Sequence, residues 1–132
     1  MGVERLKELL VSQDEILENT ILESLRGLVS LDNKNGEIYP TDRYTKLRAD
    51  AKICVYLIAR KAAHLLGLNE ADAVSAKTIR ERTGMPMGTV NPNLRALAER
   101  GIIGQNDAKE YYIPPHGLAL AREIIREGNN EA

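Results

Sequence analysis

The sequence predicts a mainly α-helical protein with one short β-hairpin near its C-terminal end. Apolar residues recur at spacings of three and four over most of the 132 residues, which is the pattern of helices with one buried face. Phe and Trp are absent, so aliphatic side chains must build the core, and this favours closely packed helices. Residues 102–113 instead read as two short strands joined around Asn106 and Asp107, which is typical of a hairpin.

Length and composition indicate one soluble globular unit, or a small domain with an appendage. Hydrophobic residues make up 43% of the chain and charged residues 28%, which are ordinary globular values. No apolar run approaches the roughly 20 residues that a bilayer span needs. The N-terminal stretch MGVERLKELL carries charges where a signal peptide is hydrophobic. We therefore expect a cytoplasmic protein.

The net charge of −1 neither favours nor excludes nucleic acid as a partner, but the charges are unevenly distributed. Residues 1–40 carry four Lys and Arg against eight Asp and Glu. Residues 41–127 carry 14 Lys and Arg against 10 Asp and Glu. An acidic leader thus precedes a mildly basic body.

Catalytic and metal-binding motifs are not found in the sequence. The single cysteine, Cys54, lies in the apolar run KICVYLIA and is expected to be a small buried hydrophobic residue. The chain has no nucleophile motif, glycine-rich phosphate loop, paired acids or clustered metal ligands. We expect neither an enzyme nor a bound cofactor or metal.

The first 40 residues are predicted to form an N-terminal helical extension. A helix is expected over residues 3–11 and a second over 13–30, with Ser12 and Glu15 forming a capping box. One continuous helix over residues 3–30 is the alternative. Residues 32–36, DNKNG, break the pattern, and an extended segment or short strand follows.

Five further elements follow, and residues 128–132 are expected to be a flexible tail. A central helix is predicted over residues 41–67, with Gly67 as its C-terminal cap. A short helix capped by Ser75 then ends at Gly84, and a second helix ends at Gly101. The hairpin and a last helix complete the chain. In the second helix, we expect Val90, Leu94 and Leu97 to face inward.

This order of elements resembles the winged helix-turn-helix superfamily over about residues 45–127. The resemblance rests on Ile79 and Gly84 of TIRERTG, on the apolar positions of TVNPNLRAL, and on ERGII before the hairpin. It implies a three-helix core plus a short β-hairpin in a domain over residues 41–127, with an N-terminal helical extension and a C-terminal helix. It also implies that residues 89–100 form a recognition helix for the DNA major groove.

The implied DNA interface combines base-reading and phosphate-binding side chains. Asn can bond adenine edges and Arg guanine edges, while a glycine at the helix start allows close approach to a phosphate. Basic residues on the preceding helix and at the hairpin tip would contact the DNA backbone. The expected interface residues are Lys77, Arg80, Gly88, Thr89, Asn91, Asn93, Arg95 and Lys109.

Each of these assignments has a simpler alternative. Asn91 and Asn93 flank Pro92 near a predicted helix start, where they could act as caps. The basic residues of the preceding helix could form a solvated face, and Lys109 could simply occupy a hairpin turn. If the helix begins at about Thr89, Pro92 falls in its first turn, where a missing N–H group costs nothing.

The resemblance therefore implies a sequence-specific transcriptional regulator that binds double-stranded DNA. We expect a homodimer, because paired recognition helices address successive grooves. The N-terminal helices, the helix over residues 41–67, or both would form its interface. The N-terminal helices could instead cover residues 41–67 within one chain. A winged-helix module that binds proteins in a replication, transcription or other assembly is the alternative function, and a ligand-sensing regulator is a third.

Overall fold

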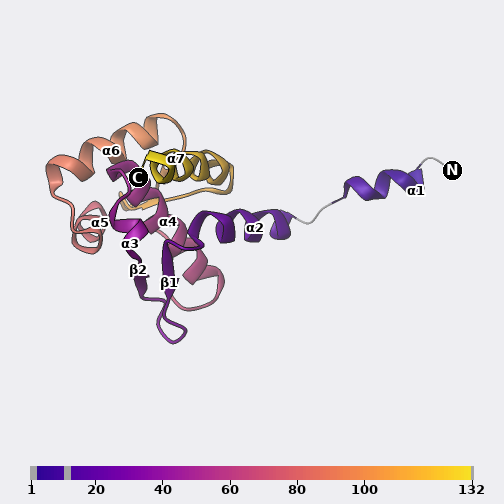
Figure 1. The fold of residues 1–132 in the computed structure, drawn as a ribbon, viewed down its shortest axis with the longest axis horizontal. Helices are drawn as coiled ribbons and strands as arrows, with labels where there is room; N and C mark the ends of the chain where they lie inside the picture. The colour runs from indigo at the N-terminus through magenta and orange to yellow at the C-terminus, as the bar shows by residue number, and fades with distance from the viewer. Residues whose placement is uncertain (1–2, 11–12, 132) are drawn as a thin grey trace.

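The computed structural model describes residues 3–10 and 13–131, and its fold is mainly helical (Figure 1). Two small antiparallel sheets of two strands each accompany the helices. In chain order the elements are α1 Val3–Leu6, η1 Lys7–Leu9, α2 Gln13–Leu25, β1 Val29–Leu31, β2 Ile38–Pro40, α3 Asp42–Thr45, α4 Ala49–Leu65, α5 Ala76–Thr83, α6 Met87–Glu99, β3 Gly104–Gln105, β4 Tyr111–Tyr112, η2 Pro115–Gly117 and α7 Leu118–Glu131.

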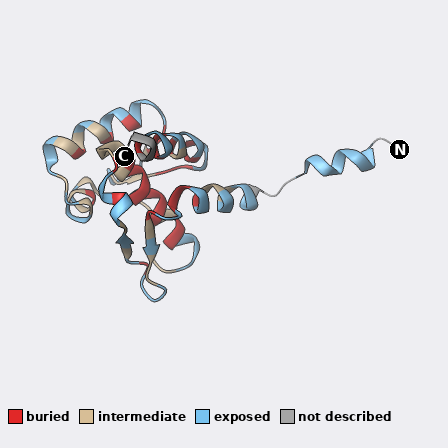
Figure 2. Ribbon diagram, in the orientation of Figure 1, coloured by how far each residue is buried: buried red, intermediate tan, exposed pale blue. Residues whose placement is uncertain are grey.

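Helix α4 forms the centre of the core, and α2, α5, α6 and α7 all pack against it. Its residues from Ile53 to Ala59 are all buried, which confirms that this helix is contacted from more than one side (Figure 2). The single helix expected over residues 41–67 is interrupted, because Arg48 adopts an extended conformation between α3 and α4. Gly67 lies just beyond the end of α4 with φ +75°, as a C-terminal cap requires.

The N-terminal extension contains a hairpin as well as helices. Helix α2 packs on α4 and α7 and ends at Leu25, earlier than the predicted residue 30. Gly27, with φ +78°, turns the chain out of the helix, and β1 then pairs antiparallel with β2. The predicted extended segment after residue 36 is thus a strand. The predicted capping residue Ser12 lies outside the described residues.

The first helical turns stand away from the body of the protein (Figure 1). Neither α1 nor η1 contains a buried residue. The apolar side chains of Val3, Leu6, Leu9 and Leu10 are between 58% and 76% exposed. The two parts of the extension therefore differ, because α2 covers the core within one chain whereas α1 does not.

Helices α5 and α6 are connected by a short turn and followed by the second hairpin. The Ser75 hydroxyl accepts a hydrogen bond from the Thr78 amide at 3.1 Å, which confirms the predicted cap of α5. Gly84 and Gly101 both adopt left-handed conformations at the predicted helix ends. Strands β3 and β4 form the predicted hairpin. Two backbone hydrogen bonds with Val74, just before α5, hold Tyr111 of β4.

The C-terminal helix α7 packs against α4 and α2. It extends through Glu131, so residues 128–131 belong to a helix and not to the expected tail. Before α7, Gly117 lies so close to the backbone carbonyl of Ile102 that a Cβ atom there would overlap the oxygen. No helix within residues 3–10 and 13–131 has the length and apolar character needed to cross a membrane.

Candidate nucleic-acid interface

Helix α6, the predicted recognition helix, buries one face and exposes the other. Val90, Leu94 and Leu97 are at most 2% exposed and pack into the core, as the spacing predicted. The helix begins at Met87, which is earlier than the predicted Thr89. Pro86 occupies the N-cap position in an extended conformation, and its carbonyl accepts the first hydrogen bonds of the helix.

The earlier start changes the position of Pro92. This proline is inside α6 rather than in its first turn. It has no N–H group to donate to the Gly88 carbonyl, so the helix lacks one internal hydrogen bond. The expectation that Pro92 costs nothing is therefore wrong. Its ring lies on the exposed face, where it adds apolar surface but no donor.

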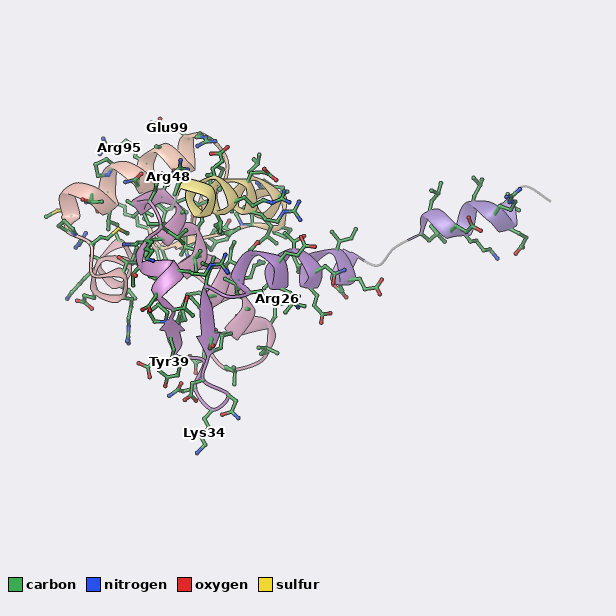
Figure 3. All side chains as sticks on the ribbon, in the orientation of Figure 1. Arg26, Lys34, Tyr39, Arg48, Arg95 and Glu99 are labelled. Carbon is green, nitrogen blue, oxygen red and sulfur yellow. The ribbon has the colours of Figure 1, made fainter. Side chains whose placement is uncertain are left out.

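Arg95 lies on the exposed face of α6, as predicted. Figure 3 shows its side chain on the outer side of α6, near Glu99. No hydrogen bond or salt bridge joins Arg95 to another residue of the described chain. Its guanidinium group, with five N–H donors in a planar fork, is thus available to an external acceptor.

Asn91 and Asn93 both make hydrogen bonds within the protein, but neither caps α6. The Asn91 side-chain oxygen accepts a hydrogen bond from Nη1 of Arg80 at 3.3 Å, which links α6 to α5. The Asn93 side-chain nitrogen donates to the Thr89 carbonyl at 2.8 Å. The capping alternative is therefore wrong. Each amide keeps free hydrogen-bonding capacity, but part of it is already used inside the protein.

The first turn of α6 presents unpaired backbone amides and an open surface. Gly88 is exposed, and a Cβ atom placed on it would meet nothing within 4 Å. Packing within the described chain therefore does not require a glycine at this position. The N–H groups of Met87 and Gly88 precede the hydrogen-bonded turns of the helix, and such groups favour an anion. Thr89 beside them is half-buried.

The remaining predicted residues lie on α5 and the second hairpin. Lys77 is exposed in the first turn of α5, whereas Arg80 is half-buried and bonded to Asn91. Lys109 occupies the turn between β3 and β4 with φ +62°. No hydrogen bond joins Lys109 to α5 or α6 among residues 3–10 and 13–131. The structure therefore brings Arg80 to α6 but leaves Lys77 and Lys109 as separate exposed charges.

One exposed residue at this surface was not predicted. Met87, the first residue of α6, is 59% exposed. The sequence pattern does not indicate Met87, because it predicts a helix start at about Thr89. The signal was the dipeptide Met85-Pro86, since a residue before proline is extended and proline is tolerated at a helix start.

The charges around this surface are mildly basic. Residues 75–110 carry six Lys and Arg against four Asp and Glu, a modest positive excess. No group of three or more His, Cys, Asp or Glu within the described residues could hold a metal ion. Burial raises the pKa of the Cys54 thiol to about 12, so this thiol stays protonated and unreactive in the core.

Comparisons of the chain with protein-family models, curated proteins and solved structures found no match. A function must therefore be argued from the residues and geometry of the protein itself.

Proposed function

We propose that the protein is a winged-helix, DNA-binding transcriptional regulator in which α6 enters the major groove. The order of α4, α5, α6 and the β3–β4 hairpin supports this proposal, because a winged helix has a three-helix core followed by a hairpin. The buried inner face of α6 supports it further, since a recognition helix must be held firmly while its outer face stays accessible. The proposal includes a cytoplasmic location.

Arg95 is the observation that carries the proposal. It projects from the exposed face of α6 and has no partner in the described chain, so its fork can bond guanine O6 and N7 without losing an internal contact. Gly88 and the free amides beside it offer a phosphate site at the helix start. Lys77 and Lys109 would add backbone contacts that carry no sequence information.

We also propose that the regulator is a homodimer. The exposed apolar residues of α1, η1 and the following Leu10 support this, because four large apolar side chains on a short segment are stabilised when a partner covers them. Analytical ultracentrifugation of the full chain and of a variant with Leu6→Glu and Leu9→Glu tests this part. A monomeric wild-type protein at micromolar concentration would contradict it.

Fluorescence anisotropy with duplex DNA chosen from a random pool tests the DNA-binding proposal. Affinity should fall steeply as salt is raised, because phosphate contacts release counterions. Arg95→Ala should weaken specific binding by about 1 to 3 kcal/mol. Arg126→Ala is the matched control, because Arg126 is an exposed arginine on α7 that pairs with Glu123.

Two outcomes separate the proposed DNA-binding function from the assignment of Arg95 to the interface. No DNA binding at low salt and micromolar protein would contradict a DNA-binding function. DNA binding that Arg95→Ala leaves as strong as Arg126→Ala would contradict only the assignment of Arg95.

A protein-binding module is the second candidate function, and the internal bonds of Asn91 and Asn93 favour it. Two of the expected base-reading side chains already use part of their capacity inside the protein. The second hairpin offers only Lys109 as a basic group. Exposed Met87 and Pro92 would suit an apolar partner surface. This candidate predicts that DNA affinity stays weak and independent of sequence.

A further inference from the structure

A cavity of about 390 Å³ lies between the β1–β2 hairpin and α4, away from the exposed face of α6. This volume is within the range of small-molecule sites. Val29, Ile38 and Pro40 form an apolar wall on the hairpin side, and polar side chains from α3, α4 and α5 line the rest. The cavity therefore combines an apolar surface with a few converging polar groups.

Two tyrosines in the cavity lining lack hydrogen-bond partners within the protein. Tyr44 and Tyr56 are 8% and 6% exposed. No hydrogen bond from either hydroxyl group to another described residue is present. Neither hydroxyl oxygen is among the fully enclosed side-chain atoms of the described chain that lack a partner, so both stay accessible to an acceptor that enters the cavity. They are therefore two available donors on one wall.

The two tyrosines and two arginines, Arg60 and Arg82, line the same cavity. Burial, followed by the neighbouring Tyr56, raises the pKa of Tyr44 to about 12. Burial also raises the pKa of Tyr56, while Arg60 and Arg82 oppose that rise. Both hydroxyls thus stay protonated near neutral pH and act as donors.

The two arginines give the cavity a positive charge. Nη2 of Arg60 donates to the Ala71 carbonyl at 2.7 Å, while its buried Nε has no partner in the described chain. Nη1 of Arg82 lies 3.7 Å from Oε1 of Glu37, in a pair whose side chains are both at least half exposed. Two guanidinium groups therefore face one carboxylate, and the surplus positive charge favours an anion.

The hairpin wall of the cavity is held in place before any ligand binds. Gly36 packs so closely on α4 and the following loop that a Cβ atom there would lie 3.0 Å from the Cβ atoms of Ala63 and Leu68. The Asp32 carboxylate accepts hydrogen bonds from the Lys34 amide at 2.8 Å and from the Tyr39 hydroxyl at 3.1 Å. A preformed wall reduces the entropy cost of binding.

We propose that this cavity binds a small aromatic carboxylate with a single ring. The carboxylate would take hydrogen bonds from Arg82 and from the two tyrosine hydroxyls, and Arg60 in the cavity lining would add positive charge. The ring would pack on the apolar wall formed by Val29, Ile38 and Pro40. This site is independent of the proposed DNA interface, so its test needs no DNA.

Methyl NMR with sodium benzoate as the probe tests the proposal. Benzoate should shift the methyl signals of Val29 and Ile38 in a saturable manner. Benzamide, which has the same shape without the charge, should bind at least about tenfold more weakly, because charged hydrogen bonds are the stronger ones. Phenyl phosphate should bind no more tightly than benzoate.

Variants then assign the groups. Arg82→Met should weaken benzoate binding about tenfold. Tyr56→Phe, which removes only the hydroxyl, should weaken it about fivefold. Arg95→Met is the matched control and should bind benzoate like the wild type, because Arg95 lies on α6. A thermal melt of each variant checks that the fold is retained.

Four results would overturn the proposal. They are methyl shifts that rise without saturating, equal affinity for benzoate and benzamide, tighter binding of phenyl phosphate, and wild-type affinity in both the Arg82 and Tyr56 variants. Failure of DNA binding has no bearing on any of them.

Discussion

Helices α4 and α6 lie against each other but have different environments. Helix α4 is enclosed by four other helices and buries a continuous run of residues from Ile53 to Ala59. Helix α6 buries three residues of one face and leaves Arg95 and Gly88 exposed on the other. Substitutions in α4 should therefore change stability, whereas those on the outer face of α6 should change binding.

The largest effect is expected from truncating the centre of α4. Ile58 is 0% exposed, so Ile58→Ala should lower the free energy of unfolding by an amount in the upper part of about 2 to 5 kcal/mol. Arg95→Ala on α6 should change it by less than about 0.5 kcal/mol. Urea denaturation measures both, and equal losses would erase the distinction between the two helices.

Burial of Cys54 in α4 makes the stability of the protein depend on pH. Its pKa is raised from 9.0 to about 12 by burial, so the folded chain keeps the proton that the unfolded chain loses. The stabilising contribution is full below pH 9 and declines as pH rises toward about 12. It should fall by about 2 kcal/mol between pH 9 and about pH 11.

The measurement is the difference in unfolding free energy between wild type and Cys54→Ala across this pH range. Taking this difference cancels the contribution of titrating lysines and tyrosines to the unfolding free energy, because both proteins contain the same ones. A difference that stays constant with pH would contradict the burial of the thiol.

Pro92→Ala in α6 should stabilise the protein, whereas truncating a buried residue of α4 should destabilise it. The substitution restores the hydrogen bond to the Gly88 carbonyl and removes a residue that is unfavourable in a helix interior. We expect a gain of about 1 to 3 kcal/mol in urea denaturation. Ala96→Pro, on the same exposed face, is the opposite control and should destabilise. A loss of stability in Pro92→Ala would mean that the proline ring makes a contact that matters.

Gly88→Ala should separate stability from binding within α6. A Cβ atom at this position meets nothing, so alanine should leave the fold intact or stabilise it by up to about 1 kcal/mol. If a phosphate approaches the helix start, the added methyl should weaken DNA binding about tenfold. Unchanged DNA affinity would remove Gly88 from the interface and leave Arg95 in it.

Local signals were sufficient to predict the helix ends at Gly84 and Gly101 and the hairpin in the second half of the fold. The Ser75 cap, the glycine-terminated ends of α5 and α6, and the hairpin around Asn106 all follow from residues within a few positions of each element. The buried face of α6 followed from spacing alone. In these elements, local preference and tertiary packing agree.

The first half was predicted less well, because tertiary contacts determine it. Nothing in the residues between α3 and α4 marks a helix break, and the chain turns there to bring Tyr44 and Leu47 into the core. Gly27 was an available signal for the end of α2, since glycine favours the left-handed conformation that it adopts.

The candidate sites divide in the same way. Helical periodicity indicates Arg95, and the expected helix start indicates Gly88; both are local properties. The cavity could not be predicted, because it joins Tyr44, Tyr56 and Arg82 from three helices with a hairpin that the spacing did not reveal. The internal bonds of Asn91 and Asn93 also depend on contacts that sequence spacing does not specify.

The close approach of Gly117 to the Ile102 carbonyl has a consequence for the evolution of this chain. Any side chain at position 117 would collide with backbone that cannot move aside, whatever the protein binds. Homologous chains should therefore keep glycine there even after their functions diverge. Position 88 is free of such packing, so glycine should persist there only in chains whose α6 meets a phosphate. Glycine at position 117 would thus mark chains that keep the fold, whereas glycine at position 88 would mark chains that also keep the function.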